Sequence, residues 1–128
     1  MMAEELVRLP VRCDALAPSV VREAISDVPD VRRVLGDAML VASELVTNAV
    51  RHSLCTEDEF LTVSVTRDGW VRISVFDPGR SGQDAEVASL PMELGGMGLK
   101  VVMELASRWG TERRADGYKV WADLELAA

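Results

Sequence analysis

The sequence predicts an α+β fold of two layers, in which a mostly antiparallel mixed sheet is covered on one face by three helices. Segments with strand and helix patterns follow one another as strand, two helices, hairpin, loop, helix and hairpin, so they do not alternate as a doubly wound parallel sheet requires. A chain of 128 residues with 48% hydrophobic residues has the length and the apolar content of one packed domain over residues 1–128. The Asp68-Gly69 pair between two alternating segments marks a tight hairpin turn.

The first half of the chain supplies one strand and two helices. Residues 5–12 alternate weakly, and Pro10 places the strand at the edge of a sheet. Residues 17–27 predict a short helix that begins near Pro18. A longer helix is expected over residues 31–52, since its apolar residues recur at intervals of three and four: Leu35, Ala38, Met39, Ala42, Leu45, Val46 and Ala49.

The second half is expected to complete the sheet. Residues 60–67 and 70–77 alternate between apolar and polar side chains and predict the two strands of a hairpin. Residues 80–94 contain glycine, proline and several acids without periodicity, which predicts a loop. The remaining expected elements are one helix and two strands, over residues 99–108, 109–114 and 118–126.

Charge and composition exclude several classes of function. The chain has 14 basic and 21 acidic residues, and it lacks the basic stripe through which proteins bind nucleic acid. No apolar run approaches the roughly 20 residues of a membrane span, and no secretory signal peptide is recognisable. Cys13 and Cys55 form no metal-binding pattern, so we expect two free thiols in a reducing cytoplasm.

A polar stripe crosses the long predicted helix. Glu44 and Asn48 lie four residues apart, and Arg51 or His52 continues the stripe one turn later. These residues could simply form the solvated face of the helix. However, apolar residues flank the stripe on both sides and asparagine has a poor helix propensity, which favours a role of the stripe in binding.

Two further segments carry polar or glycine residues where a ligand could approach. Strand alternation puts Asp77 on the core side of its strand, where burying a carboxylate costs free energy unless it is paired or bound to a ligand. The alternative is that Asp77 only begins the Asp-Pro-Gly turn. The glycine-rich sequence 95–99 opens a helix, so its backbone could cradle phosphates, or it could be a hinge. Together with the helix stripe, these segments would suit one nucleotide.

The same segments resemble a known family. ELVTNAVRH (44–52), FDPG (76–79) and GGMGL (95–99) resemble the N-box and the two glycine boxes of the gyrase–chaperone–histidine-kinase–MutL ATPase superfamily. The chain is most similar to the small bacterial anti-sigma-factor and serine-kinase branch, in which an RWG sequence and a final strand containing VW also recur. The resemblance covers about residues 20–126. It implies a Bergerat-type sandwich forming one histidine-kinase-like ATP-binding domain, with residues 80–94 as the ATP lid.

The resemblance also implies roles for individual residues. Asn48 would coordinate the magnesium ion of MgATP, Asp77 would bind the adenine amino group, and Glu44 would act as the general base. The residues that would surround the ring and the phosphates are Gly79, Gly95, Gly96, Gly98 and Leu99.

Two departures from the family pattern bear on nucleotide binding. Tyr118-Lys119 stands where members of the family carry a threonine near the adenine-binding aspartate. The first glycine box continues as Arg80-Ser81-Gly82, so its second glycine is out of the usual register.

The implied function is that of an ATP-binding anti-sigma factor with serine/threonine-protein kinase activity. Its expected partners are a sigma factor, a STAS-type anti-anti-sigma protein and, through exposed residues such as Trp70, a second copy of the chain. The alternative is a non-catalytic protein-binding module of the same fold, in which ATP is a conformational ligand or is no longer bound.

Overall fold

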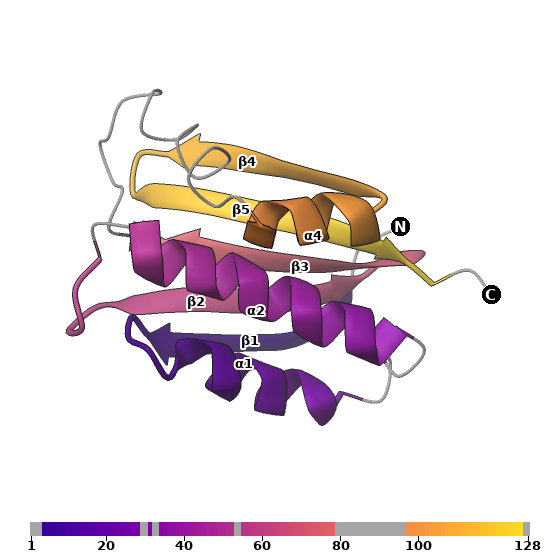
Figure 1. Ribbon diagram of the computed structural model, residues 1–128, viewed down its shortest axis with the longest axis horizontal. Coiled ribbons are helices and arrows are strands. Elements are labelled where there is room, and N and C mark those ends of the chain that lie inside the picture. The colour runs from indigo at the N-terminus through magenta and orange to yellow at the C-terminus, as the bar shows by residue number, and fades with distance from the viewer. Residues whose placement is uncertain (1–3, 29–30, 32–33, 53–54, 79–96, 127–128) are drawn as a thin grey trace.

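The computed structural model describes residues 4–28, 31, 34–52, 55–78 and 97–126. Within these residues, five strands form one sheet, and three helices lie on one of its faces (Figure 1). The predicted two-layer α+β fold is therefore confirmed. In chain order the elements are β1 (Glu4–Arg12), α1 (Ala17–Ser26), α2 (Leu35–His52), β2 (Phe60–Arg67), β3 (Trp70–Asp77), α4 (Met97–Leu105), β4 (Arg108–Arg114) and β5 (Gly117–Glu125).

The strands of the sheet lie in the order β1-β2-β3-β5-β4, and every pairing among the described strands is antiparallel. β1 is an edge strand, as the proline at position 10 predicts. The C-terminal strand β5 lies between β3 and β4, so the β2–β3 hairpin meets the β4–β5 hairpin at the β3–β5 ladder. This ladder places Asp77, at the end of β3, opposite Tyr118 near the start of β5.

The hydrophobic core fills the space between the sheet and the helices. Alternate residues of β2 and β3 are buried, as their sequence pattern predicts, because side chains two positions apart share one face of a strand. The buried side of α2 packs on the sheet, in contact with β3 and β5, with the apolar stripe that its periodicity predicts. The core residues of these elements are Val41, Ala42, Leu45, Val46, Leu61, Val63, Val65, Val71, Ile73 and Val75.

Four helix boundaries differ from those that the sequence predicts: α1 ends one residue earlier, at Ser26, α4 begins two residues earlier, at Met97, and the other two boundaries shift by three or four residues. The long helix begins at Leu35 rather than at residue 31, although Val31 is fully buried and packs in the core. The last helix ends at Leu105 rather than at residue 108, because the backbone N–H of Ser107 already donates to the carbonyl oxygen of Asp123, at 2.9 Å. The chain thus pairs with β5 immediately after the helix, and Arg108 begins β4.

The expectation of two free thiols is wrong, since Cys13 and Cys55 form a disulfide with a Cα–Cα distance of 6.4 Å. The two cysteines are 42 positions apart in the sequence, so their proximity depends on the pairing of β1 with β2. Arg12 lies opposite Phe60 in this pairing, and the backbone N–H of Cys13 donates to the carbonyl oxygen of Glu59, at 3.0 Å. This register brings the end of β1 beside the segment that follows α2.

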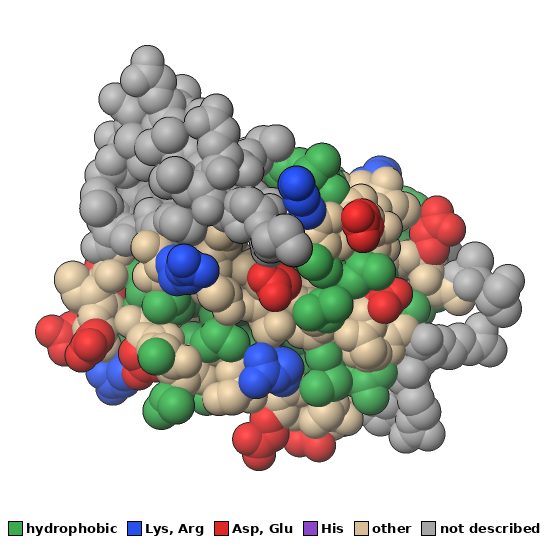
Figure 2. All heavy atoms as spheres, in the orientation of Figure 1, with side chains coloured by type: hydrophobic (Ala, Val, Ile, Leu, Met, Phe, Trp, Pro, Cys, Tyr) green, Lys and Arg blue, Asp and Glu red, His purple; other side chains and the backbone are tan. Residues whose placement is uncertain are grey.

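The surface on the helix side is mixed in character. Figure 2 shows acidic, basic and hydrophobic side chains interspersed over the described part of this face. Exposed apolar side chains here include Val20 of α1, Leu40 of α2 and Met103 of α4. None of the described helices has the length and hydropathy that a membrane span requires.

Candidate functional site

The polar stripe of the long helix lies in the second half of α2. Glu44 and Asn48 are both half-buried, and their neighbours Leu45 and Val46 are buried in the core. The stripe therefore runs along the margin of the packed face and not along the fully solvated side of the helix. α2 contacts α1, α4, β3 and β5, so this margin lies close to several elements at once.

Asp77 occupies the last position of β3 and is 3% exposed. It shares the helix-facing side of the strand with Val71, Ile73 and Val75, as the alternation predicts. A carboxylate can accept about four hydrogen bonds through its two oxygen atoms, so a group of this type can bind a ligand and protein groups at the same time.

The start of β5 sets the position of Asp77. A Cβ atom added to Gly117 would lie 2.6 Å from the backbone oxygen of Asp77 and 2.4 Å from Cζ of Phe76. The two strands approach this closely because residue 117 has no side chain. The sequence pattern marks Asp116-Gly117 only as a turn, so the contact between Gly117 and the end of β3 could not be inferred without the β3–β5 pairing.

Tyr118 lies directly opposite Asp77 and is 2% exposed, on the same side of the sheet. The sequence resemblance predicts that the residue at this point of the last strand lies near Asp77. The structure confirms this position for Tyr118, which stands where members of the family carry a threonine.

Three elements of the candidate site meet at one end of the sheet. The C-terminal half of α2, the end of β3 and the start of α4 lie toward the same side in Figure 1, and α2 contacts both β3 and α4. Gly98 belongs to the first turn of α4, and Leu99 follows it in the same helix. Gly79, Gly95, Gly96 and the segment 80–94 lie outside the described residues.

The described residues fit a magnesium ion only as part of a nucleotide complex. No group of three or more His, Cys, Asp or Glu side chains in the described part of the chain could hold a metal. Magnesium is commonly held by one or two protein oxygens together with phosphate oxygens and water. A single amide oxygen, such as that of Asn48, is consistent with this kind of site and not with a metal cage built by the protein alone.

Solved structures agree with this architecture. The crystal structure of the RsbU and RsbW domains of Rv1364c from Mycobacterium tuberculosis is similar to this chain, with a TM-score of 0.70 and 22% sequence identity. The match covers 95% of this chain but 32% of that one, so this chain spans about a third of the length of the solved protein. The likeness shows a shared fold. A comparison with curated protein sequences gave no match.

The sequence also matches a family of known fold. Residues 35–128 match the family described as histidine kinase-, DNA gyrase B- and HSP90-like ATPase. The matched range begins at the first residue of α2 and includes Asn48, Asp77 and the whole C-terminal hairpin. It covers well over half of the chain, and the chain therefore belongs to the histidine kinase-, DNA gyrase B- and HSP90-like ATPase family.

Proposed function

We propose that the chain is an ATP-binding regulatory protein whose nucleotide site lies between the second half of α2, the end of β3 and the start of α4. The observation that carries this proposal is the position of Asp77, a buried carboxylate on the helix face at the end of a strand. An adenine amino group is a donor that such an acceptor can bind specifically. Membership in an ATPase family supports the same ligand.

The remaining residues complete the proposed site around the nucleotide. Asn48, four residues before the end of α2, would hold the magnesium ion through its side-chain oxygen. The N-terminus of α4 offers backbone N–H groups to phosphate oxygens. The glycines would allow the backbone to approach the ring and the phosphates: Gly79, Gly95, Gly96 and Gly98, followed by Leu99.

We further propose that the protein is a serine/threonine-protein kinase. MgATP supplies the phosphoryl group and neutralises its charge, so the protein contributes mainly positioning. Glu44 lies one helical turn before Asn48 on the same face of α2, where its carboxylate would accept the proton of a substrate hydroxyl. The family resemblance suggests a serine of a STAS-type anti-anti-sigma protein as the acceptor and a sigma factor as the regulated partner. These partners would place the protein in the cytoplasm.

A calorimetric titration of ATP, with and without magnesium, tests the nucleotide site. We expect magnesium-dependent binding that both Asp77→Asn and Asn48→Ala abolish. Asp58→Asn is the matched control, because Asp58 is exposed in the turn before β2 and its loss should leave affinity unchanged. Thermal unfolding of each variant checks that the fold is retained. Absence of binding at millimolar ATP would refute the site.

Transfer of labelled phosphate from ATP to a serine-bearing antagonist tests the kinase proposal separately. Glu44→Gln should abolish transfer while leaving ATP affinity close to that of the wild type. Glu23→Gln, on the exposed side of α1, is the control that should transfer normally. Unaltered transfer by Glu44→Gln would show that the proposed base is wrong, even if the nucleotide site is correct.

A second candidate function is favoured by the position of Tyr118. This buried side chain lies opposite Asp77, where members of the family carry a threonine. A non-catalytic module of the same fold would then regulate a partner by sequestering it, with ATP as a conformational ligand or with no ATP bound. Partner binding that is independent of ATP and unaffected by Glu44→Gln would favour this function.

A further inference from the structure

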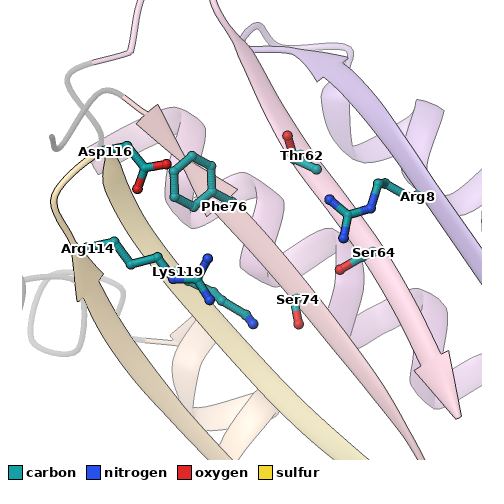
Figure 3. Close-up of a pocket in the computed structure, with 8 residues that line it drawn as sticks. All are labelled: Arg8, Thr62, Ser64, Ser74, Phe76, Arg114, Asp116 and Lys119. Carbon is teal, nitrogen blue, oxygen red and sulfur yellow. The ribbon is translucent and has the colours of Figure 1, made fainter. Parts of the chain in front are cut away.

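The face of the sheet opposite the helices carries a groove that crosses all five strands. Side chains alternate along a strand, so Phe76 and Lys119 line this open face, while their neighbours Asp77 and Tyr118 are buried on the helix side. The groove has a volume of about 300 Å³ (Figure 3). It thus lies back to back with the proposed nucleotide site and shares no described side chain with it.

The groove is hollow because short side chains lie between long ones. Ser64 of β2 and Ser74 of β3 are directly opposite each other and form a floor of hydroxyl groups. Arg8 of β1 borders this floor on one side, and Lys119 of β5 borders it on the other. In Figure 3 the side chains of Arg8 and Lys119 extend toward the floor from these opposite sides.

Each arginine of the two rims pairs with one glutamate among the described residues. Nε of Arg8 donates to Glu5 at 2.8 Å, and Nε of Arg114 donates to Glu112 at 2.6 Å. These bonds engage only one nitrogen of each guanidinium, so the terminal nitrogens can bind a ligand. Burial lowers the pKa of Lys119 below its ordinary value, and the nearby guanidinium of Arg114 lowers it further, so a bound anion would stabilise the charged form of this side chain.

The occupant suited to this charge is an anion. Arg8, Arg114 and Lys119 line the groove together with a single acidic residue, Asp116. The charged side chains that line the groove are thus mostly basic, in a chain whose formal net charge is −7. Guanidinium groups bind carboxylates and phosphates in the same forked geometry, so charge alone does not separate a small anion from a polymeric one.

Three inter-strand steps separate β1 from β5, which corresponds to roughly 14 Å between their backbones. An extended segment of about four residues spans this distance and can present a carboxylate at each rim.

A rigid aromatic surface adjoins the groove. Trp121 lies opposite Ser74, and the guanidinium of Arg72 stacks over its ring at 4.0 Å. Asp123, fully buried, accepts bonds from two nitrogens of Arg72 at 2.7 and 3.0 Å and so fixes this stack. A Cβ atom at Gly110 would lie 2.8 Å from the Trp121 ring, so the glycine allows the ring to lie against β4. Tryptophan and arginine held in place before binding are typical of protein-recognition surfaces.

We propose that this groove binds an acidic segment of a partner protein. Carboxylates of the segment lie between Arg8 on one rim and Lys119 and Arg114 on the other, and Trp121 packs against the adjoining residues of the partner. The groove shares no described residue with the proposed nucleotide site, because it lies on the opposite face of the sheet.

A labelled peptide tests the proposal with the full chain. The probe is a fluorescein-labelled peptide of about eight residues that alternates glutamate and glycine, long enough to span the groove when extended. The control peptide carries glutamine in place of glutamate. Fluorescence anisotropy gives the affinity, and amide and indole NMR signals give the location. We expect binding of the glutamate peptide only, with shifts at Ser64, Ser74 and the indole of Trp121.

Variants of the rim sharpen the test. Combined Arg8→Gln and Lys119→Gln substitutions should weaken binding by roughly tenfold, and salt should weaken it further. Arg22→Gln is the matched control, because Arg22 is exposed on α1, outside the groove lining.

Several outcomes would overturn the proposal. These are no binding of the glutamate peptide, equal binding of the glutamine peptide, NMR shifts outside the groove, or competition by inorganic phosphate at the affinity of the peptide. A dimer in sedimentation that the double variant dissociates would also overturn it, because the face would then be covered by a second copy.

Discussion

Substitution of Gly117 by alanine perturbs the contact that positions the end of β3. The added Cβ would lie 2.6 Å from the backbone oxygen of Asp77, and ordinary contact begins at 3.4 Å, so the strands must separate by about 0.8 Å. Phe76 adds a second clash on the same atom, at 2.4 Å. Overpacking of this kind costs about 1–3 kcal/mol of unfolding free energy.

The same movement should weaken nucleotide binding if Asp77 binds adenine. Loss of one hydrogen bond to a charged group costs about 1.5–3 kcal/mol, which corresponds to at least about a tenfold loss of affinity. Urea unfolding measures the first effect, and calorimetric titration of MgATP measures the second. The two measurements are independent, because the clash exists whether or not the chain binds ATP.

Gly36→Ala is the control for the Gly117 variant. No atom lies within 4 Å of a Cβ placed at Gly36, which is exposed in the first turn of α2, so alanine should be neutral or should stabilise by up to about 1 kcal/mol. A Gly117→Ala protein as stable as the wild type would refute the close approach of β5 to β3. A destabilised Gly117→Ala variant with unchanged ATP affinity would support the close contact at Gly117 but contradict the proposed role of Asp77 in binding adenine.

Three further perturbations, two of them substitutions and one a chemical reduction, test other parts of the fold. Asp123→Asn should lower the unfolding free energy by about 3 kcal/mol, because its fully buried carboxylate pairs with two arginines. The control Glu112→Gln, in an exposed pair, should leave the unfolding free energy nearly unchanged. Equal effects of the two substitutions in urea unfolding would contradict this difference. Reduction of the Cys13–Cys55 disulfide should lower the unfolding free energy by about 4 kcal/mol, because the unfolded chain regains the entropy of a loop of 42 residues. An unchanged melting temperature in dithiothreitol would argue against the bond. Lys119→Gln should stabilise the protein at neutral pH, because the lowered pKa of Lys119 means that its charged form is disfavoured in the folded state. This gain should disappear as the pH rises through the ordinary pKa range of lysine, so a gain that stays constant with pH would contradict the cause.

The local parts of the fold could be predicted from the sequence. Alternation over 60–67 and 70–77 matches β2 and β3 residue for residue, because each strand buries one face on the core. The same alternation predicts that Asp77 faces the helices, which the structure confirms. These features depend only on the alternating direction of side chains along a strand, which can be read from the sequence of one segment.

The parts that were missed depend on pairing between distant segments. The disulfide requires the β1–β2 register, and the role of Gly117 requires the insertion of β5 beside β3. The basic groove is likewise assembled from residues on all five strands and has no signature in any one of them. The roles of Glu44 and Asn48 stay predictions, since a role in binding or catalysis requires the ligand.

The position of β5 has a consequence for how the chain folds during synthesis. β5 lies between β3 and β4, yet residues 117–125 are made after all the other described elements. Until they are available, the edge of β3 that pairs with β5 lacks its partner strand, and such an edge is a template for pairing with other chains. At roughly 5–20 residues per second the interval is short. The central ladder of the sheet nevertheless closes last, so the insertion of this strand is the step at which misassembly competes with folding.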